Sequence, residues 1–434
     1  MASTRLPLSA VIKSYKGFKI SEIRSNIKRL IESDEMQRPS FATSWLTASP
    51  PEGAVVVEEY GVGDAKIAIY SLPNETEMLY FVFLPEYDMS TEYAKIIHKA
   101  KERLIEALPL NIDIEDMEDV RAYITDVGRK MLMAISRDEK VSLGESRWEI
   151  DKKVGDLVGI LAKYTAGLGA IETLLLDEHV QDIYIDAPAE KTPVYITLGG
   201  FVNKNVYGRA VTNIMLSRED VDSLVSRFRY ESGRPFSEAF PLLETDLRIY
   251  QTRVTVIGKP LSPHGIAIAL RRHSTEPWTL LKFIANGTLN SLSAALLSFF
   301  VDGKSTIIVA GSRGAGKTSL LGALMLELPK SQRILTIEDT LELPVNKMKN
   351  LGYKVQSLYV RSSLEQSTQF SASDALRVSL RLGESAIVMG EVRGEEARVL
   401  YEAMRAGSAG SSVMGTFHAD SPRAVYERVV HDMG

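Results

Sequence analysis

The chain has 434 residues, of which 45% are hydrophobic and 25% are charged, a composition typical of two or three globular domains. The net charge of −5 argues against a bulk nucleic-acid binder, and the lack of cysteine excludes disulfides and thiolate metal sites. We expect no signal peptide, because no apolar core follows Arg5. We also expect no membrane span, because the most apolar short run, residues 292–301, is far below the roughly 20 residues that cross a bilayer.

Residues 1–110 are predicted to form a small α+β module. Segments rich in β-branched and aromatic residues predict strands at 54–58, 66–70 and 78–83. A start resembling a capping box at Ser90 predicts a helix that runs to about residue 108. The module holds no residues that suggest chemistry, and we interpret it as an accessory or docking unit.

Residues 111–288 are predicted to form a second α+β domain. Apolar residues recur at three- and four-residue spacing before residue 180, which predicts helices. Strands are then predicted at residues 182–186, 193–197, 246–250 and 265–270. One helix is predicted among these strands, because Ser217 and Asp220 have capping-box spacing. Pro277 and Gly287 mark the expected linker to the next domain.

Residues 289–434 change to alternating strands and helices. Strands are predicted at residues 305–310, 333–337, 385–389 and 411–416, and helices at 318–328, 373–382, 395–406 and 421–433. This alternation predicts a parallel α/β sheet, whose sites lie beyond the carboxyl ends of its strands.

A phosphate-binding loop is predicted after the first of these strands. Residues 311–318 fit the pattern G-x-x-x-x-G-K-[ST], and a strand precedes them while a helix follows. The glycines allow backbone N–H groups to surround phosphate oxygens, Lys317 supplies a positive charge, and the Thr318 hydroxyl suits Mg²⁺. The predicted nucleotide-binding residues are Gly311, Ser312, Arg313, Gly314, Ala315, Gly316, Lys317, Thr318 and Ser319.

Acidic residues follow two other strands of the same predicted sheet. Glu338 and Asp339 end one strand and Glu391 follows another, so their side chains are expected near the loop. Triphosphate hydrolysis needs Mg²⁺ and a group that orients water, and two carboxylates can share these duties. His418 follows the last strand and is a candidate for contact with the γ-phosphate, although a structural role fits it equally well.

At these residues the chain resembles the secretion and traffic ATPases of type II and type IV systems, especially the archaeal GspE, archaellum and pilus-assembly branch. Four motifs carry the resemblance, in the family's order. Residues 311–318 resemble its Walker A loop, 334–342 its Asp box, 386–393 its Walker B motif with Gly-Glu, and 416–421 its His box.

The resemblance implies both the fold and further site residues. It implies a RecA-like ATPase domain over residues 289–434, preceded by a PAS-like α+β domain over 111–288 and the small N-terminal module. It also implies that arginines of the preceding domain reach toward nucleotide. The positions carried over are Arg253 as a binding residue and Arg271 and Arg272 as catalytic residues.

Two departures from the family pattern stand out. The family often has a histidine early in its His box, and residues 406–410 hold none. Family members generally continue with a further helical subdomain, so we expect that the C-terminal part of the motor domain is missing from this chain.

The resemblance implies a cytoplasmic ATPase, peripheral at the inner face of the cell membrane, with ATP and Mg²⁺ as cofactors. Such a protein assembles as a homohexameric ring and pushes on a polytopic membrane platform protein to power filament assembly or secretion. We assign water activation to Glu338 and the Mg²⁺ side to Glu391 with Thr318; the two glutamates can exchange these roles, which makes Glu338 a second candidate metal ligand. His418 completes the catalytic set.

Alternative functions are less consistent with the sequence. A GTPase would need the motif N-K-x-D, and residues 346–349 lack its aspartate. A small-molecule kinase explains neither Glu391 nor the large upstream region, and a scaffold without turnover does not need both carboxylates. A RecA-like nucleic-acid translocase shares the ATPase core and is the main alternative, but the negative charge and the lack of a basic, aromatic stripe oppose it.

Overall fold

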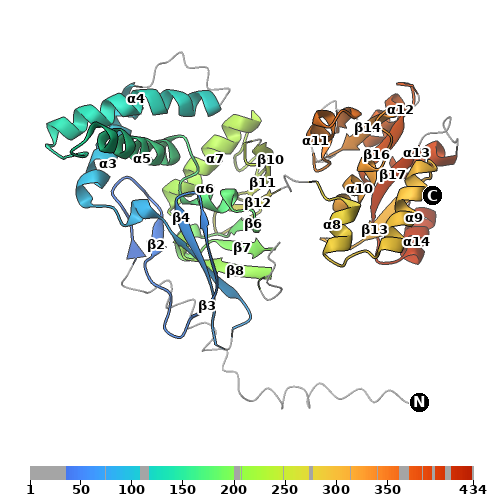
Figure 1. Ribbon diagram of the computed structural model, residues 1–434, viewed down its shortest axis with the longest axis horizontal. Coiled ribbons are helices and arrows are strands. Elements are labelled where there is room, and N and C mark those ends of the chain that lie inside the picture. Colours follow the sequence, from blue (N-terminus) through green and yellow to red (C-terminus); the bar gives the residue numbers. More distant parts are fainter. Residues whose placement is uncertain are drawn as a thin grey trace. The chain divides into compact units, whose positions relative to one another are not determined.

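The computed structural model describes residues 36–73, 75–107, 117–199, 206, 208–247, 249–272, 277–312, 314–339, 341–360, 371–383, 385–392, 396–405 and 412–432. The chain divides into two compact units, residues 1–273 and 274–434, each with its own sheet and core (Figure 1).

The first unit is organised around a nine-stranded sheet with the order β10-β11-β12-β6-β7-β8-β5-β4-β3. Its strands are β3 (Val55–Val62), β4 (Ala65–Ser71), β5 (Met78–Phe83), β6 (Val180–Ile185), β7 (Tyr195–Leu198), β8 (Gly208–Thr212), β10 (Leu242–Leu247), β11 (Thr252–Ile257) and β12 (Ala267–Arg272). Neighbouring strands pair antiparallel, except that β5 and β8 pair parallel.

Helices and a smaller sheet complete the first unit. The smaller sheet has the order β1-β2-β9. The elements are β1 (Met36–Gln37), β2 (Trp45–Thr47), β9 (Ile214–Met215), η1 (Pro85–Tyr87), η2 (Ala189–Lys191), α3 (Thr91–Ala107), α4 (Met117–Asp138), α5 (Arg147–Thr165), α6 (Ala170–Leu176) and α7 (Arg218–Ser232). Helices α3, α4 and α5 pack on one another (Figure 1). The capping box that predicts α7 is present, because Ser217 Oγ accepts the Asp220 amide at 3.1 Å.

The predicted N-terminal module shares its sheet and core with the residues that follow it. Strand β5 pairs with β8, with Met78 opposite Ala210 and Tyr80 opposite Thr212. The Asn213 side chain donates to the carbonyl of Val82 at 3.1 Å and to that of Thr47 at 3.0 Å, which joins both sheets. The compact units therefore differ from the three predicted domains, because pairing between strands distant in sequence makes residues 1–273 one unit.

The second unit contains a five-stranded parallel sheet with the order β13-β17-β16-β14-β15. The strands are β13 (Ile307–Gly311), β14 (Arg333–Glu338), β15 (Lys354–Tyr359), β16 (Ala386–Val392) and β17 (Val413–His418). The helices are α8 (Leu280–Ala285), α9 (Ser291–Asp302), α10 (Lys317–Leu326), α11 (Val345–Asn350), α12 (Ala372–Ser379), α13 (Glu396–Arg405) and α14 (Pro422–Asp432). The predicted parallel α/β sheet is confirmed. Strands β14, β16 and β17 are almost continuously buried, as expected where helices cover a parallel sheet.

Some predicted boundaries need correction. The segment expected to be a linker contains α8, because Leu280 and Phe283 are buried in the core of the second unit. The strand predicted at residues 246–250 is β10, which begins earlier, at Leu242. Strands β8, β11 and β15 were not predicted, although β11 alternates between buried and half-buried residues.

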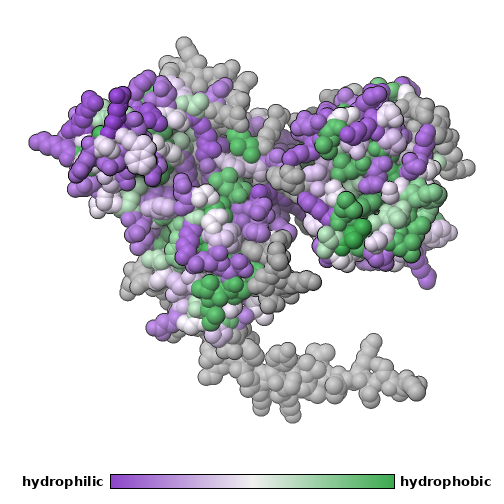
Figure 2. Space-filling view, in the orientation of Figure 1, coloured by the Kyte–Doolittle hydropathy of each residue, from purple (hydrophilic) through white to green (hydrophobic). Residues whose placement is uncertain are grey.

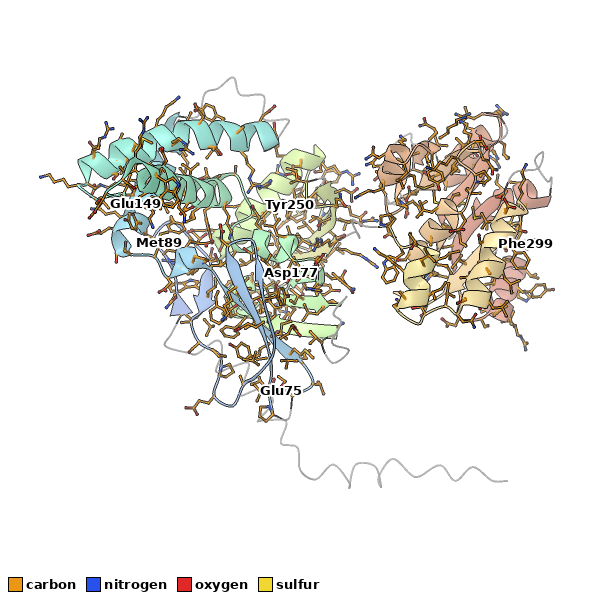
Figure 3. The ribbon with its side chains drawn as sticks, in the orientation of Figure 1. Glu75, Met89, Glu149, Asp177, Tyr250 and Phe299 are labelled. Atoms are coloured by element: carbon orange, nitrogen blue, oxygen red, sulfur yellow. The ribbon has the colours of Figure 1, made fainter. Side chains whose placement is uncertain are left out.

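Large apolar side chains are exposed on two helices of the second unit. On α8, Leu281 is 76% exposed; on α9, Leu292 and Phe299 are 70% and 69% exposed. Figure 2 shows apolar surface over this part of the unit, and Figure 3 labels Phe299. An exposed apolar surface of this kind is typical of a region that another protein surface covers.

Within the described ranges, no single helix combines the length and hydrophobicity of a membrane span. Helices α5 and α6 reach that threshold only as a pair, which is bent by 99°.

Candidate active site

The phosphate-loop sequence lies between a strand and a helix, as predicted. Strand β13 ends at Gly311, and α10 begins at Lys317. Gly314 and Gly316 have φ angles of +76° and +83°, in the left-handed region where a side chain is disfavoured. Gly316 is a fixed glycine of the pattern and Gly314 occupies a variable position, and the backbone conformation favours glycine at both. Arg313 lies outside the described residues.

The first turn of α10 presents its polar groups at the end of the loop. The Lys317 Nζ donates to the Ser312 carbonyl at 2.8 Å, so the ammonium lies over the loop. Thr318 and Ser319 follow it and are half-buried. Backbone amides at the start of a helix have no acceptor within that helix, which makes this end favourable for an anion.

Strand order brings His418 and Glu391 beside the loop. Strand β17 pairs with β13 on one side, with His418 opposite Gly311, and with β16 on the other. His418 Nε2 lies 3.1 Å from Glu391 Oε1. The His418 side chain is 37% exposed and that of Glu391 is 19% exposed. The predicted histidine and Walker B glutamate are therefore in contact at the carboxyl end of the sheet.

A β-bulge in β16 directs Glu391. The register between β16 and β17 shifts between Met389 and Val392, which places Gly390 and Glu391 in the bulge. The Thr416 hydroxyl donates to the Gly390 carbonyl at 2.6 Å and holds this bulge against β17. Bulges next to active sites commonly redirect a side chain. Our sequence reasoning gave no role to Thr416; its position two residues before His418 in the same strand was the available signal.

Glu338 ends β14 and is buried next to Gly390 of the bulge. Glu338 is 2% exposed. Its Oε1 accepts hydrogen bonds from the backbone amides of Glu342 at 2.9 Å and Leu343 at 2.8 Å. Among the described residues, its Oε2 has no hydrogen-bond partner. A Cβ on Gly390 would lie 3.1 Å from Glu338 Cγ, so the glycine allows the carboxyl to pack there.

Burial raises the pKa of Glu338 to about 7, despite the two backbone hydrogen bonds that favour its charged form. The nearby carboxylates of Glu342 and Asp339 raise it further. A carboxyl with a pKa near neutrality can both accept and release a proton at physiological pH.

The oxygen-bearing side chains near the loop suit a metal ion that phosphates also bind. No group of three or more His, Cys, Asp or Glu side chains able to hold a metal occurs in the part of the chain that the structure describes. Mg²⁺ is usually held by one or two protein groups together with substrate phosphates and water. Thr318 at the loop and Glu391 beside it fit that mode, whereas Glu338 has one carboxyl oxygen already engaged by backbone amides.

The predicted arginines lie on adjacent strands of the first unit. Arg253 on β11 is paired in register with Arg271 on β12. Arg253 Nη2 lies 3.3 Å from Glu244 Oε2, and Arg271 Nε lies 3.9 Å from Asp182 Oδ1. Arg272 Nη1 donates to the backbone carbonyl of Asp177. Their role toward nucleotide stays a prediction.

The second unit is a parallel α/β domain with a phosphate-loop sequence at the end of β13 and a glutamate–histidine pair beside it. Residues 173–434 match the family model described as type II/IV secretion system protein, and the chain belongs to this family. The predicted resemblance is therefore confirmed.

Individual relatives share part of the chain. The uncharacterised Methanocaldococcus jannaschii protein MJ0900 is 26% identical over 384 residues, which cover 86% of this chain and 66% of that protein. The Bordetella pertussis type IV secretion system protein PtlH is 35% identical over 133 residues, 31% of this chain and 38% of that protein. The X-ray structure of the Legionella pneumophila ATPase DotB has a TM-score of 0.43 and 20% identity, over 61% of this chain and 68% of that one. The chain thus spans about two thirds of the length of MJ0900 and much less of PtlH.

Proposed function

We propose that this protein hydrolyses ATP to ADP and phosphate with Mg²⁺. The observation that carries the proposal is the contact between Glu391 and His418 on the strands next to the phosphate loop. It is supported by the left-handed Gly314 and Gly316 and by Lys317 at the start of α10. The loop backbone binds an anion, and Lys317 places a positive charge on the phosphates. The carboxylates bind Mg²⁺ and orient the attacking water.

The roles of the two glutamates follow from their environments. Glu391 is partly exposed beside the loop and suits the Mg²⁺ side, together with the Thr318 hydroxyl. Glu338, with a pKa near 7, suits the group that accepts a proton from attacking water. Glu338→Gln should then bind ATP with Mg²⁺ and hydrolyse it slowly. If only Glu391→Gln shows this behaviour, the two roles are exchanged.

Arg253, Arg271 and Arg272 would act on the phosphates of ATP, as the family resemblance implies. Charges that stabilise a transition state raise kcat more than they strengthen substrate binding. The proposal extends to assembly: a homohexameric ring at the cytoplasmic face of the membrane that acts on a polytopic membrane protein. Family membership supports it, and so does the exposed apolar surface of α8 and α9.

The test is Mg²⁺-dependent release of phosphate from ATP. Lys317→Ala should lower turnover by about 10²-fold or more, because it removes a cation from the phosphates. Lys354→Ala removes an exposed lysine from edge strand β15 of the same unit and serves as the control. Wild-type turnover by Lys317→Ala would contradict the loop assignment.

The partner is tested by affinity capture from source-cell membranes, with Glu338→Gln held in ATP and Mg²⁺ as bait. Recovery of a polytopic membrane protein with filament or secretion subunits would support the proposal and identify the pathway. Recovery of DNA with its processing enzymes, and stimulation of ATP hydrolysis by DNA, would favour the translocase instead.

A further inference from the structure

A buried carboxylate joins the N-terminal strands to Arg272. Asp177 follows α6 and is 1% exposed (labelled in Figure 3). Its Oδ2 accepts the hydroxyl of Tyr60 on β3 at 2.6 Å and that of Tyr80 on β5 at 2.5 Å. Its Oδ1 accepts the His179 amide at 2.9 Å. We call Asp177 together with Tyr60, Tyr80, His179 and Arg272 the Asp177 node.

The hydrogen bonds of the node compensate for burying a charge. A carboxylate removed from water is costly unless donors surround it, and here two hydroxyls and an amide do so. Burial and the neighbouring carboxylate raise the pKa of both tyrosines, so each hydroxyl keeps its proton and donates. The Tyr60 ring also packs edge-on against the His179 ring, with centroids 5.3 Å apart.

The main chain of the same residue holds the arginine. The Asp177 carbonyl accepts Arg272 Nη1 and the Val180 amide. Arg272 ends β12, which pairs with β6 through Arg271 opposite Asp182. The side chain of Asp177 is thus fixed by the N-terminal strands while its carbonyl fixes Arg272. Tyr60 and Tyr80 precede residue 173, where the family match begins, whereas Asp177 and Arg272 lie within it.

We propose that Tyr60 and Tyr80 are positioning residues that set the Arg272 guanidinium through Asp177. The inference rests on the proposed role of Arg272 in ATP hydrolysis. It gives the N-terminal strands a function within the enzyme itself. A charge acts on a transition state only when it is held in place, and a displacement of about 1 Å can lower the rate by about 10²-fold.

The test removes one hydroxyl at a time. Tyr60→Phe and Tyr80→Phe keep the ring and the fold, and each leaves Asp177 Oδ2 with one donor. Tyr87→Phe is the matched control, since its hydroxyl is also buried in the first unit but contacts Ser44 at 2.7 Å and not Asp177. We expect Tyr80→Phe to lower kcat roughly tenfold with KM within about twofold. Tyr60→Phe should act in the same direction, and Tyr87→Phe should leave both constants unchanged.

A double-mutant cycle separates positioning from general loss of structure. In an Arg272→Ala background, Tyr80→Phe should lower kcat no further, because the arginine it positions is gone. An equal loss of kcat in both backgrounds, or the same loss in Tyr87→Phe, would overturn the inference.

Hydrogen exchange distinguishes failure of this inference from failure of the proposed function. Peptides over residues 177–180 should exchange at least about tenfold faster in Tyr80→Phe than in the wild type or Tyr87→Phe. If the wild-type protein does not hydrolyse ATP, the proposed function fails, and the exchange rates still test the node. Unchanged exchange at these residues would show that the hydroxyls do not hold Asp177.

Discussion

The raised pKa of Glu338 predicts a specific pH dependence of the second unit's stability. A glutamate titrates near 4.5 in the unfolded chain, and burial raises the pKa of Glu338 to about 7 in the folded one. The folded state therefore favours the protonated carboxyl. The stability that the protonated Glu338 carboxyl contributes to the folded state is fully present below pH 4.5. It declines as the pH rises and is lost above pH 7. The shift corresponds to about 3 kcal/mol, of which about 2–3 kcal/mol falls between pH 5 and pH 8.

Glu338→Gln removes this titration while keeping the shape of the side chain. Its amide oxygen can still accept the amides of Glu342 and Leu343. Its NH₂ group would take the place of Oε2, which has no partner among the described residues, at a cost of about 1–3 kcal/mol. That cost does not vary with pH. The quantity to compare is therefore the difference in unfolding free energy between wild type and variant as a function of pH.

Fluorescence of Trp278 can report on the second unit alone. The chain has 3 tryptophans, and Trp45→Phe with Trp148→Phe leaves Trp278, whose ring lies 4.9 Å from that of Phe283. Urea unfolding in this background should show that the wild type loses about 2–3 kcal/mol relative to Glu338→Gln from pH 5 to pH 8.

The test needs a control variant, and one result would refute the expected pH dependence. Glu342→Gln removes an exposed carboxyl from the same turn, and its charge raises the pKa of Glu338 less than burial does, so the decline from pH 5 to pH 8 should become only slightly smaller. Parallel stability curves for wild type and Glu338→Gln would refute the reasoning, because they would mean that the Glu338 carboxyl has the same pKa folded and unfolded.

Two further substitutions test the loop and the bulge. Gly316→Ala forces a side chain into a φ of +83° and should destabilise the second unit by about 1–2 kcal/mol and weaken ATP binding, measured by urea unfolding and by calorimetric titration. Unchanged stability and affinity would mean that the loop relaxes to another conformation. Thr416→Val keeps the shape of Thr416 but removes its bond to the Gly390 carbonyl; kcat should fall about tenfold with a stability loss near 1 kcal/mol. A normal kcat would show that the bulge directs Glu391 without this hydroxyl.

Local sequence patterns predicted the parts of the second unit that depend on neighbouring residues. Alternating apolar strands and helices predicted the parallel sheet, since each strand buried on both faces needs a near-continuous apolar run. The glycines and Lys317 predicted the phosphate-binding loop, and the acidic residues marked the carboxyl ends of β14 and β16. These features are encoded within a few residues, so a single sequence reveals them.

Long-range pairing could not be predicted in this way. The bond from Thr416 to Gly390 depends on β17 lying beside β16 with a shifted register. The order of strands places His418 on Glu391, although the two are 27 positions apart in the chain. Neither the periodicity of apolar residues nor the composition predicts which strands become neighbours in the sheet.

The first unit shows the same limit most clearly. Its N-terminal strands were recognised from their β-branched and aromatic residues, yet their place in the sheet depends on β5 pairing with β8. Tyr80 lies in the strand predicted at residues 78–83, whereas Tyr60 lies beyond the strand predicted at 54–58, and no role was predicted for Asp177. Only the tertiary structure makes them a hydrogen-bonded group with Arg272, because a buried carboxylate is stable where the fold brings donors from distant segments to it.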